Sequence, residues 1–160
     1  MDRADIAVDQ WARERPDLPS LPMAIFGRIS DASERVLRDH MNPLFAEAGL
    51  QPGEFDVLAT LRRSGAPFML SPTQLYQAMM ISSGGMTARL DRLERAGLVE
   101  RRLDPDDRRG KLIALTERGR RAIDVTIGRH VANEERLLGG LSGEEQEMLN
   151  LLLKKLVAGL

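Results

Sequence analysis

The chain of 160 residues contains no cysteine and only two histidines, His40 and His130. Without cysteine it has no disulfides, cysteine-ligated zinc, iron–sulfur clusters or thiol nucleophiles. The two histidines lie too far apart in the sequence to form a spaced metal-binding pair, and neither a G-x-G-x-x-G motif nor a phosphate-binding loop is present. We therefore expect no metal, no cofactor and no enzymatic activity.

Long apolar runs and aromatic side chains are also scarce. No run of about 18 apolar residues is present, so neither a transmembrane helix nor a membrane partner is expected. The mixed, acidic start of the chain, residues 1–5, does not resemble a signal peptide. With only 4% aromatic residues, the core must come mostly from Leu, Ile, Val, Ala and Met, which favours helices. We expect a soluble, cytoplasmic and mainly α-helical protein.

The net charge of −1 conceals an uneven distribution. Residues 89–121 contain 11 basic and 7 acidic side chains, so this segment carries +4 and the remainder of the chain carries −5. A solvated helix face with mixed ion pairs would have the same composition. A nucleic-acid-binding protein with so small a net charge would also have to concentrate its basic residues in this way.

Hydrophobic periodicity, capping residues and breakers divide the chain into helices and one β-hairpin. Ser71 and Ser142 each stand three residues before a Gln or Glu and predict helix starts, and Pro43 should interrupt a long second helix. Pro16, Pro19 and Pro22 should form a stiff connector. Helices are expected over residues 6–13, 23–48, 52–63, 72–79, 83–96 and 117–138, and a last helix after Ser142 that includes residues 149–156; strands are expected over 98–103 and 111–115.

Two short helices joined by a Ser/Gly turn and followed by a charged hairpin indicate a winged helix-turn-helix. In the second helix, Met86, Leu90 and Leu93 share the core side, and Thr87 and Ala88 lie opposite. At the hairpin tip, an arginine held by Asp107 would enter a narrow minor groove. The predicted DNA contacts are Ser71, Thr73, Ser82, Ser83, Gly84, Thr87, Ala88, Arg92, Arg108, Arg109 and Lys111. Helix packing by the small residues, and a solvated turn at the tip, are the structural alternatives.

Four runs of sequence resemble the MarR family of winged-helix transcriptional regulators: GEFDVLATLRRSG, SPTQL, SSGGMTARLDRLERAGLVERR and DPDDRRGKLIALTERGR, which together span residues 53–120. The resemblance implies a winged-helix lobe at 50–117 and a helical dimerisation region at 1–48 and 118–160, forming one MarR-like domain over 1–160. It also implies a triangular homodimer on a double-stranded palindromic operator, with Arg109 as the minor-groove arginine.

A narrower resemblance is to the urate-responsive branch of that family, which includes the PecS-type regulators. The residues that carry it are Trp11, Asp56, Arg89 and Arg101. It implies that these four bind a small-molecule effector, urate or another aromatic anion. We hypothesise that the anion binds Arg89 and Trp11, repels Asp56 and shifts the recognition helix. A structural Asp56–arginine ion pair, with Trp11 packing a dimer, is the alternative.

The sequence therefore predicts a ligand-responsive transcriptional regulator that acts as a repressor. A winged-helix module that binds protein without binding DNA remains the second interpretation. The dependence of DNA affinity on salt separates the two, because neutralised phosphates release counterions only if DNA is bound.

Overall fold

The computed structural model describes residues 1–51, 53–79, 85–105 and 110–160. The chain divides into two compact units, Met1–Gly49 and Leu50–Leu160. The fold class is confirmed: the chain is mainly helical, with one small antiparallel sheet. Across the described ranges, no helix is long and apolar enough to cross a membrane.

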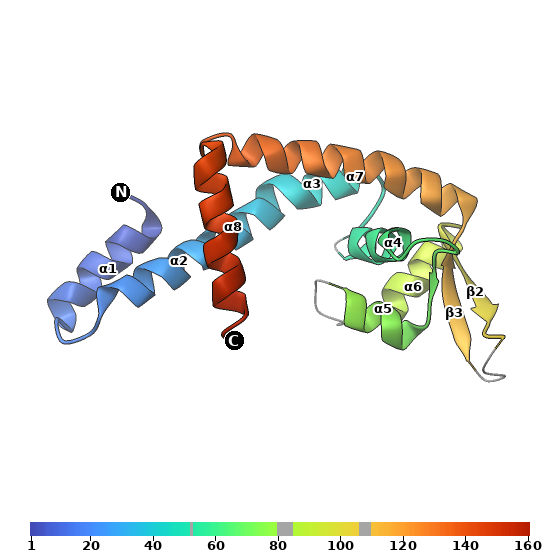
Figure 1. The fold of residues 1–160 in the computed structure, drawn as a ribbon, viewed down its shortest axis with the longest axis horizontal. Coiled ribbons are helices and arrows are strands. Elements are labelled where there is room, and N and C mark those ends of the chain that lie inside the picture. The colour runs from blue at the N-terminus through green and yellow to red at the C-terminus, as the bar shows by residue number, and fades with distance from the viewer. Residues whose placement is uncertain (52, 80–84, 106–109) are drawn as a thin grey trace. The chain divides into compact units, whose positions relative to one another are not determined.

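In the first unit, α1 (Arg3–Glu14) folds back beside α2 (Ser20–Arg35), as Figure 1 shows. The expected first helix was too short, because Asp2 begins it with a capping box. The Asp2 carboxylate accepts from the backbone N–H of Asp5, and the Asp5 carboxylate accepts from that of Asp2. The two helices approach closely at Gly27, where an added Cβ would lie 3.3 Å from the Cβ of Ala4.

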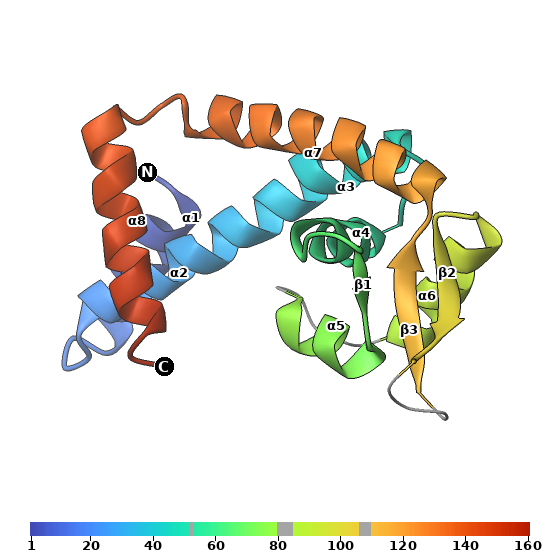
Figure 2. The same cartoon turned by 45° about the vertical axis from the view of Figure 1, so that its right-hand side comes forward.

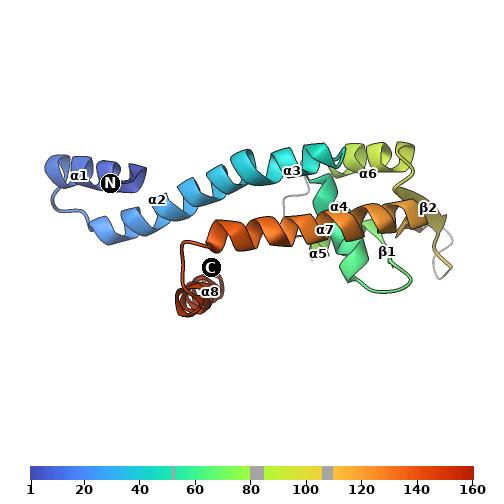
Figure 3. The same cartoon turned by 90° about the horizontal axis from the view of Figure 1, so that it is seen from above.

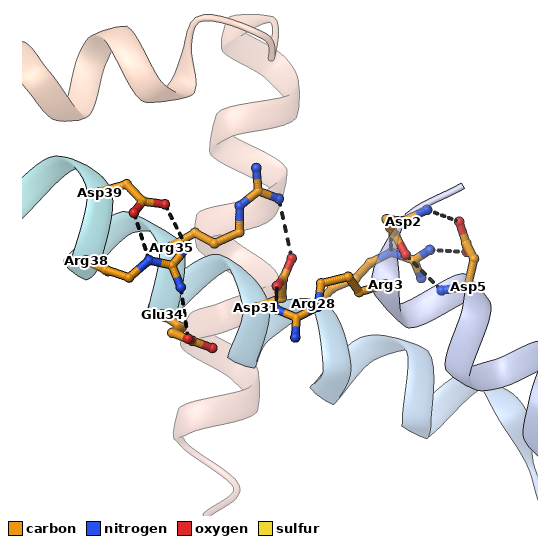
Figure 4. Close-up of polar contacts among 9 residues, drawn as sticks. All are labelled: Asp2, Arg3, Asp5, Arg28, Asp31, Glu34, Arg35, Arg38 and Asp39. Carbon is orange, nitrogen blue, oxygen red and sulfur yellow. Dashed lines mark hydrogen bonds and ion pairs between the residues drawn. The ribbon is translucent and has the colours of Figure 1, made fainter.

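Exposed ion pairs join the start of α1 to α2 (Figure 4). The Arg28 guanidinium lies 2.9 Å from the Asp2 carboxylate and 2.5 Å from that of Asp5. In a third pair α1 supplies the cation: the Arg3 guanidinium lies 3.0 Å from the carboxylate of Asp31 on α2. The Asp5 backbone N–H, assisted by Arg28, holds the pKa of the Asp2 carboxyl below its ordinary value. Ion pairs therefore supplement the packing of α1 on α2 at Ala4 and Gly27.

Prolines shape the second helix in two ways. Pro22 lies at its third position rather than in a connector as expected, and it is tolerated there because first-turn N–H groups have no intrahelical partner. Pro43 has no N–H to donate to the preceding turn. The expected interruption before it takes the form of a π-helical segment, η1 (Val36–Met41), in which the Asn42 N–H donates to the carbonyl of Leu37. The regular helix α3 (Asn42–Glu47) follows.

The second unit begins with α4 (Glu54–Arg63), whose N-cap is Gly53 at φ 82°. The expected start at Pro52 is wrong in its boundary, and Pro52 itself lies outside the described residues. Phe55, Leu58 and Leu61 form the buried face of α4: Phe55 is 8% exposed, and Leu58 and Leu61 are fully buried.

Next comes β1 (Met69–Leu70), and then α5 (Pro72–Ala78), α6 (Met86–Arg95) and the hairpin β2 (Val99–Leu103)–β3 (Lys111–Leu115). The hairpin is confirmed, but the sequence missed β1, which pairs antiparallel with the far edge of β3 and gives the order β1-β3-β2 (Figure 2). The short β1 owes its position to its pairing with β3, a contact between distant parts of the chain.

Two long helices complete the second unit: α7 (Glu117–Leu138) and α8 (Gly143–Val157). Both helices are capped: Thr116 accepts from the N–H of Gly119, and Ser142 forms the predicted capping box with Glu145. The chain turns sharply between them, so that α8 is seen nearly end-on where α7 lies across the view (Figure 3). No residue of α8 is buried, although the helix is rich in leucine.

Candidate nucleic-acid interface

The helix-turn-helix consists of α5 and α6, and α6 has two chemically different faces. Leu90 and Leu93 are 5% and 1% exposed and hold the helix to the core of the second unit. Thr87 and Ala88 are exposed. Gly85 caps α6 at φ 76°, which only glycine adopts without strain. These small exposed side chains leave room for a close approach by another molecule.

The other predicted DNA contacts have varied positions. Ser71 is occupied as the N-cap of α5, where its Oγ accepts from the Gln74 N–H at 3.2 Å. Thr73 lies exposed in the first turn of that helix, and Lys111 lies exposed at the start of β3. Five predicted contacts lie outside the described residues: Ser82, Ser83, Gly84, Arg108 and Arg109.

Arg92 is committed to a partner inside the protein. Its Nε lies 2.9 Å from the Oε1 of Glu54, whose side chain is 5% exposed. Its Nη1 also donates to the side-chain oxygen of Gln51. The second carboxylate oxygen of Glu54 accepts from the Gln51 N–H at 2.7 Å. The pair joins α6 to the first residue of α4.

Arg101 joins the hairpin to the opposite side of α6. Its guanidinium lies 2.5 Å from the Oδ1 of Asp91 and also pairs with Glu94. Its backbone N–H donates to Glu94 at 3.3 Å. The hydrogen bond to Asp91 is the main reason that the pKa of Arg101 is raised. These contacts fix β2 against α6 and neutralise two carboxylates of that helix.

Two of the predicted ligand residues lie near the start of α4. Asp56 is half-buried in the first turn, and the half-buried Arg89 packs its guanidinium against Gly53. A Cβ added at Gly53 would lie 2.6 Å from the Nε of Arg89. The cationic side chain therefore lies beside the helix terminus that favours anions. Trp11 belongs to the first unit, on α1, and is 50% exposed.

Sequence reasoning missed two residues of this region. Glu54 has the appearance of an ordinary first-turn acid, and its partner Arg92 stands 38 residues later. Arg95, an exposed residue of α6, is not among the predicted DNA contacts. Among the described residues, no cluster of three or more His, Asp or Glu side chains is arranged to hold a metal ion.

The comparisons with known proteins agree with this architecture. Residues 48–110 match the MarR family. The chain is 43% identical to the HTH-type transcriptional regulator PecS of Dickeya dadantii over 146 residues, which cover 91% of this chain and 87% of PecS. It is 30% identical to the multiple antibiotic resistance protein MarR of Escherichia coli over 132 residues, covering 81% and 85%.

Two solved structures have a fold similar to that of this chain. A MarR-like regulator from Bacillus cereus superposes with a TM-score of 0.77 at 23% identity, covering 89% of this chain and 99% of that one. A variant of E. coli MarR in complex with operator DNA superposes with a TM-score of 0.70 at 25% identity, covering 91% and 96%. These likenesses confirm the fold expected from the sequence.

Proposed function

The chain belongs to the MarR family, and we propose that it is a ligand-responsive transcriptional regulator that binds a palindromic DNA operator as a homodimer. The relatives of this family named above are transcriptional regulators, so an enzymatic role is excluded on family grounds. The observation that carries the proposal is the exposed face of α6, where Thr87 and Ala88 lie opposite the buried Leu90 and Leu93. In a helix-turn-helix this face enters the major groove.

Selection of duplexes from a random pool, followed by fluorescence anisotropy at several salt concentrations, tests DNA binding. Between about 6 and 10 phosphate contacts would give a log–log slope of about −5 to −9. A protein that binds no duplex, or that binds without dependence on salt, would favour the protein-interaction module instead.

Exposed apolar side chains of α8 support the proposed homodimer. Leu149, Leu152 and Leu153 are 40%, 55% and 39% exposed, and Val157 is 68% exposed. An apolar helix surface of this kind is usually covered by another element or subunit. A second copy would also match the symmetry of a palindromic operator. Analytical ultracentrifugation should give a dimer at micromolar concentration, and Leu152→Glu should shift it toward monomer; a monomeric wild type would contradict the proposal.

The contact between Arg89 and Gly53 supports an anionic effector. An anion bound there would pair with the Arg89 guanidinium and face the N-terminus of α4. The same anion would repel the Asp56 carboxylate in the first turn of α4. Urate is the effector proposed from the branch resemblance, and PecS is the relative with 43% identity. We propose that binding of the anion displaces Asp56, shifts α6 and releases the operator.

Titration of urate into the complex with the selected duplex tests the effector. The wild type should lose affinity for DNA, and Arg89→Gln should keep the DNA complex intact in urate. Because Trp11 is the sole tryptophan, its fluorescence should be quenched if urate binds beside it. Undiminished DNA binding at millimolar urate would reject this ligand and leave the DNA-binding proposal intact.

A further inference from the structure

Two arginines in the second half of α6, Arg92 and Arg95, differ sharply in their surroundings. The side chain of Arg92 is 33% exposed, whereas Arg95 is an exposed residue. Both carry the charge that would attract a phosphate, so sequence alone gives no reason to choose between them. Their positions on the helix and their partners distinguish the two arginines.

Arg92 pairs with a buried carboxylate, that of Glu54, whose negative charge needs a cationic partner. Both oxygens of the buried Glu54 side chain are used, one by Arg92 and the other by the Gln51 N–H. Removing Arg92 from this pair to reach DNA would leave a negative charge buried at the start of α4, which is strongly unfavourable. Arg92 therefore stays with Glu54 and fixes the angle of α6 on α4.

Arg95 has no comparable buried carboxylate partner among the described residues. Its Nε donates to the backbone carbonyl of Asp91 at 3.2 Å, and within the described ranges it forms no ion pair. At about 100° per residue, Arg95 projects between Thr87 and Ala88, about two turns toward the C-terminus of the helix. Arg92 projects about 60° further round, toward the core side.

The surrounding charges also favour Arg95. Asp91 and Glu94, which would repel a phosphate beside it, are both paired with Arg101. When the first turns of a recognition helix face the bases, side chains further along it approach the flanking backbone.

We infer that the two arginines have separate roles: Arg92, through Glu54, is a positioning residue that orients α6, and Arg95 contacts a phosphate of the operator. The inference rests on the proposed DNA-binding function. It replaces Arg92 with Arg95 as the arginine of α6 that touches DNA.

The test measures affinity for the selected duplex from about 50 to about 200 mM salt for Arg92→Gln, Arg92→Lys, Arg95→Gln and Arg95→Lys. Each phosphate contact contributes about 0.9 to the log–log slope, so Arg95→Gln should flatten the slope by about 1.8 for a dimer. Arg95→Lys should retain affinity within about threefold, since a phosphate accepts either cation. Arg92→Lys should weaken binding about tenfold or more with the slope unchanged, because lysine cannot bridge Glu54 and Gln51 as the planar guanidinium does.

The DNA affinity of each variant is calculated from the concentration of folded protein. Circular dichroism confirms that each variant is folded at the temperature used. Glu54→Gln supplies a second variant, which should reproduce the loss of affinity at constant slope. Combining Glu54→Gln with Arg92→Gln should cost no more than either change alone, because one interaction is removed in all three proteins. A merely structural pair would lower thermal stability and leave the affinity of the folded protein unchanged.

The possible outcomes are distinguishable. If the wild type binds DNA and Arg92→Gln flattens the slope while Arg95→Gln does not, the assignment of roles is overturned and the proposed function stands. Unchanged affinity in folded Arg92→Lys and Glu54→Gln would overturn the positioning role. A wild type that binds no duplex at any salt concentration would reject both the inference and the proposed function.

Discussion

Each of the two units is stabilised internally by a different kind of interaction. Of residues 1–49, only Ala4, Met41 and Phe45 are buried, and α1 is joined to α2 by exposed ion pairs. The second unit has fully buried side chains from α4, the sheet and α7, Leu58, Ile113 and Ile123 among them. Burial resists changes of salt and pH, whereas exposed ion pairs are screened by salt. The first unit should therefore respond to solution conditions that leave the core of the second unchanged.

The largest effect is expected from Gly119→Ala at the junction of the hairpin and α7. A Cβ at this position would lie 1.9 Å from the backbone carbonyl oxygen of Leu98, so α7 or the adjoining strand must move. We expect a loss of about 1–3 kcal/mol or more, as for other overpacked sites. Urea denaturation followed by circular dichroism measures it.

Gly128→Ala provides the matched control on the same helix, since a Cβ there meets nothing within 4 Å. This substitution should stabilise the protein by about 0.5–1 kcal/mol through helix propensity. If both variants lost the same stability, close packing at Gly119 would not be what holds the junction.

A smaller effect is expected from Arg28→Gln in the first unit. Losing the contacts with Asp2 and Asp5 should loosen α1 without unfolding the second unit. Trp11 lies on α1 and is the only tryptophan, so acrylamide quenching of its fluorescence reports this helix selectively. Arg38→Gln is the control, because the ion pairs of Arg38 are with its near neighbours Glu34 and Asp39 on the same helical stretch. Equal quenching in both variants would contradict an ionic attachment of α1.

The smallest effect is the response of α1 to acid. The folded-state pKa of Asp2 is lowered, chiefly by the Asp5 N–H and then by Arg28. The stability that this carboxylate contributes is therefore complete above its ordinary pKa, and it is lost as the pH falls through the lowered value. Quenching of Trp11 should be constant near neutral pH and rise only in acid. Asp2→Asn, which keeps a capping side chain, should lack this step; an unchanged step would assign it to other carboxylates.

Local signals predicted much of the fold correctly. The capping boxes at Ser71 and Ser142 and the Thr116 cap depend on residues three apart, so the sequence displays them directly. The capping box that begins α1 depends on the same spacing, from Asp2 to Asp5. The π-helical segment before Pro43 was predicted as an interruption, but its form depends on how the freed carbonyls find partners.

The rest depends on residues far apart in the chain. The strand β1 exists because Met69 and Leu70 pair with Ala114 and Ile113. The role of Arg92 depends on Glu54, and the packing of Arg89 depends on Gly53. Helix periodicity gave no sign of these partners, which decide what each arginine is available to contact.

The central claim, that the exposed face of α6 binds duplex DNA, is tested most directly by comparing the wild type with Ala88→Glu. Ala88 is exposed, and glutamate is a good helix former, so the variant should keep its fold and stability. Anisotropy with the selected duplex should show affinity about a hundredfold weaker for the variant, because a carboxylate facing DNA costs several kcal/mol. Equal affinity for the two folded proteins would contradict the claim.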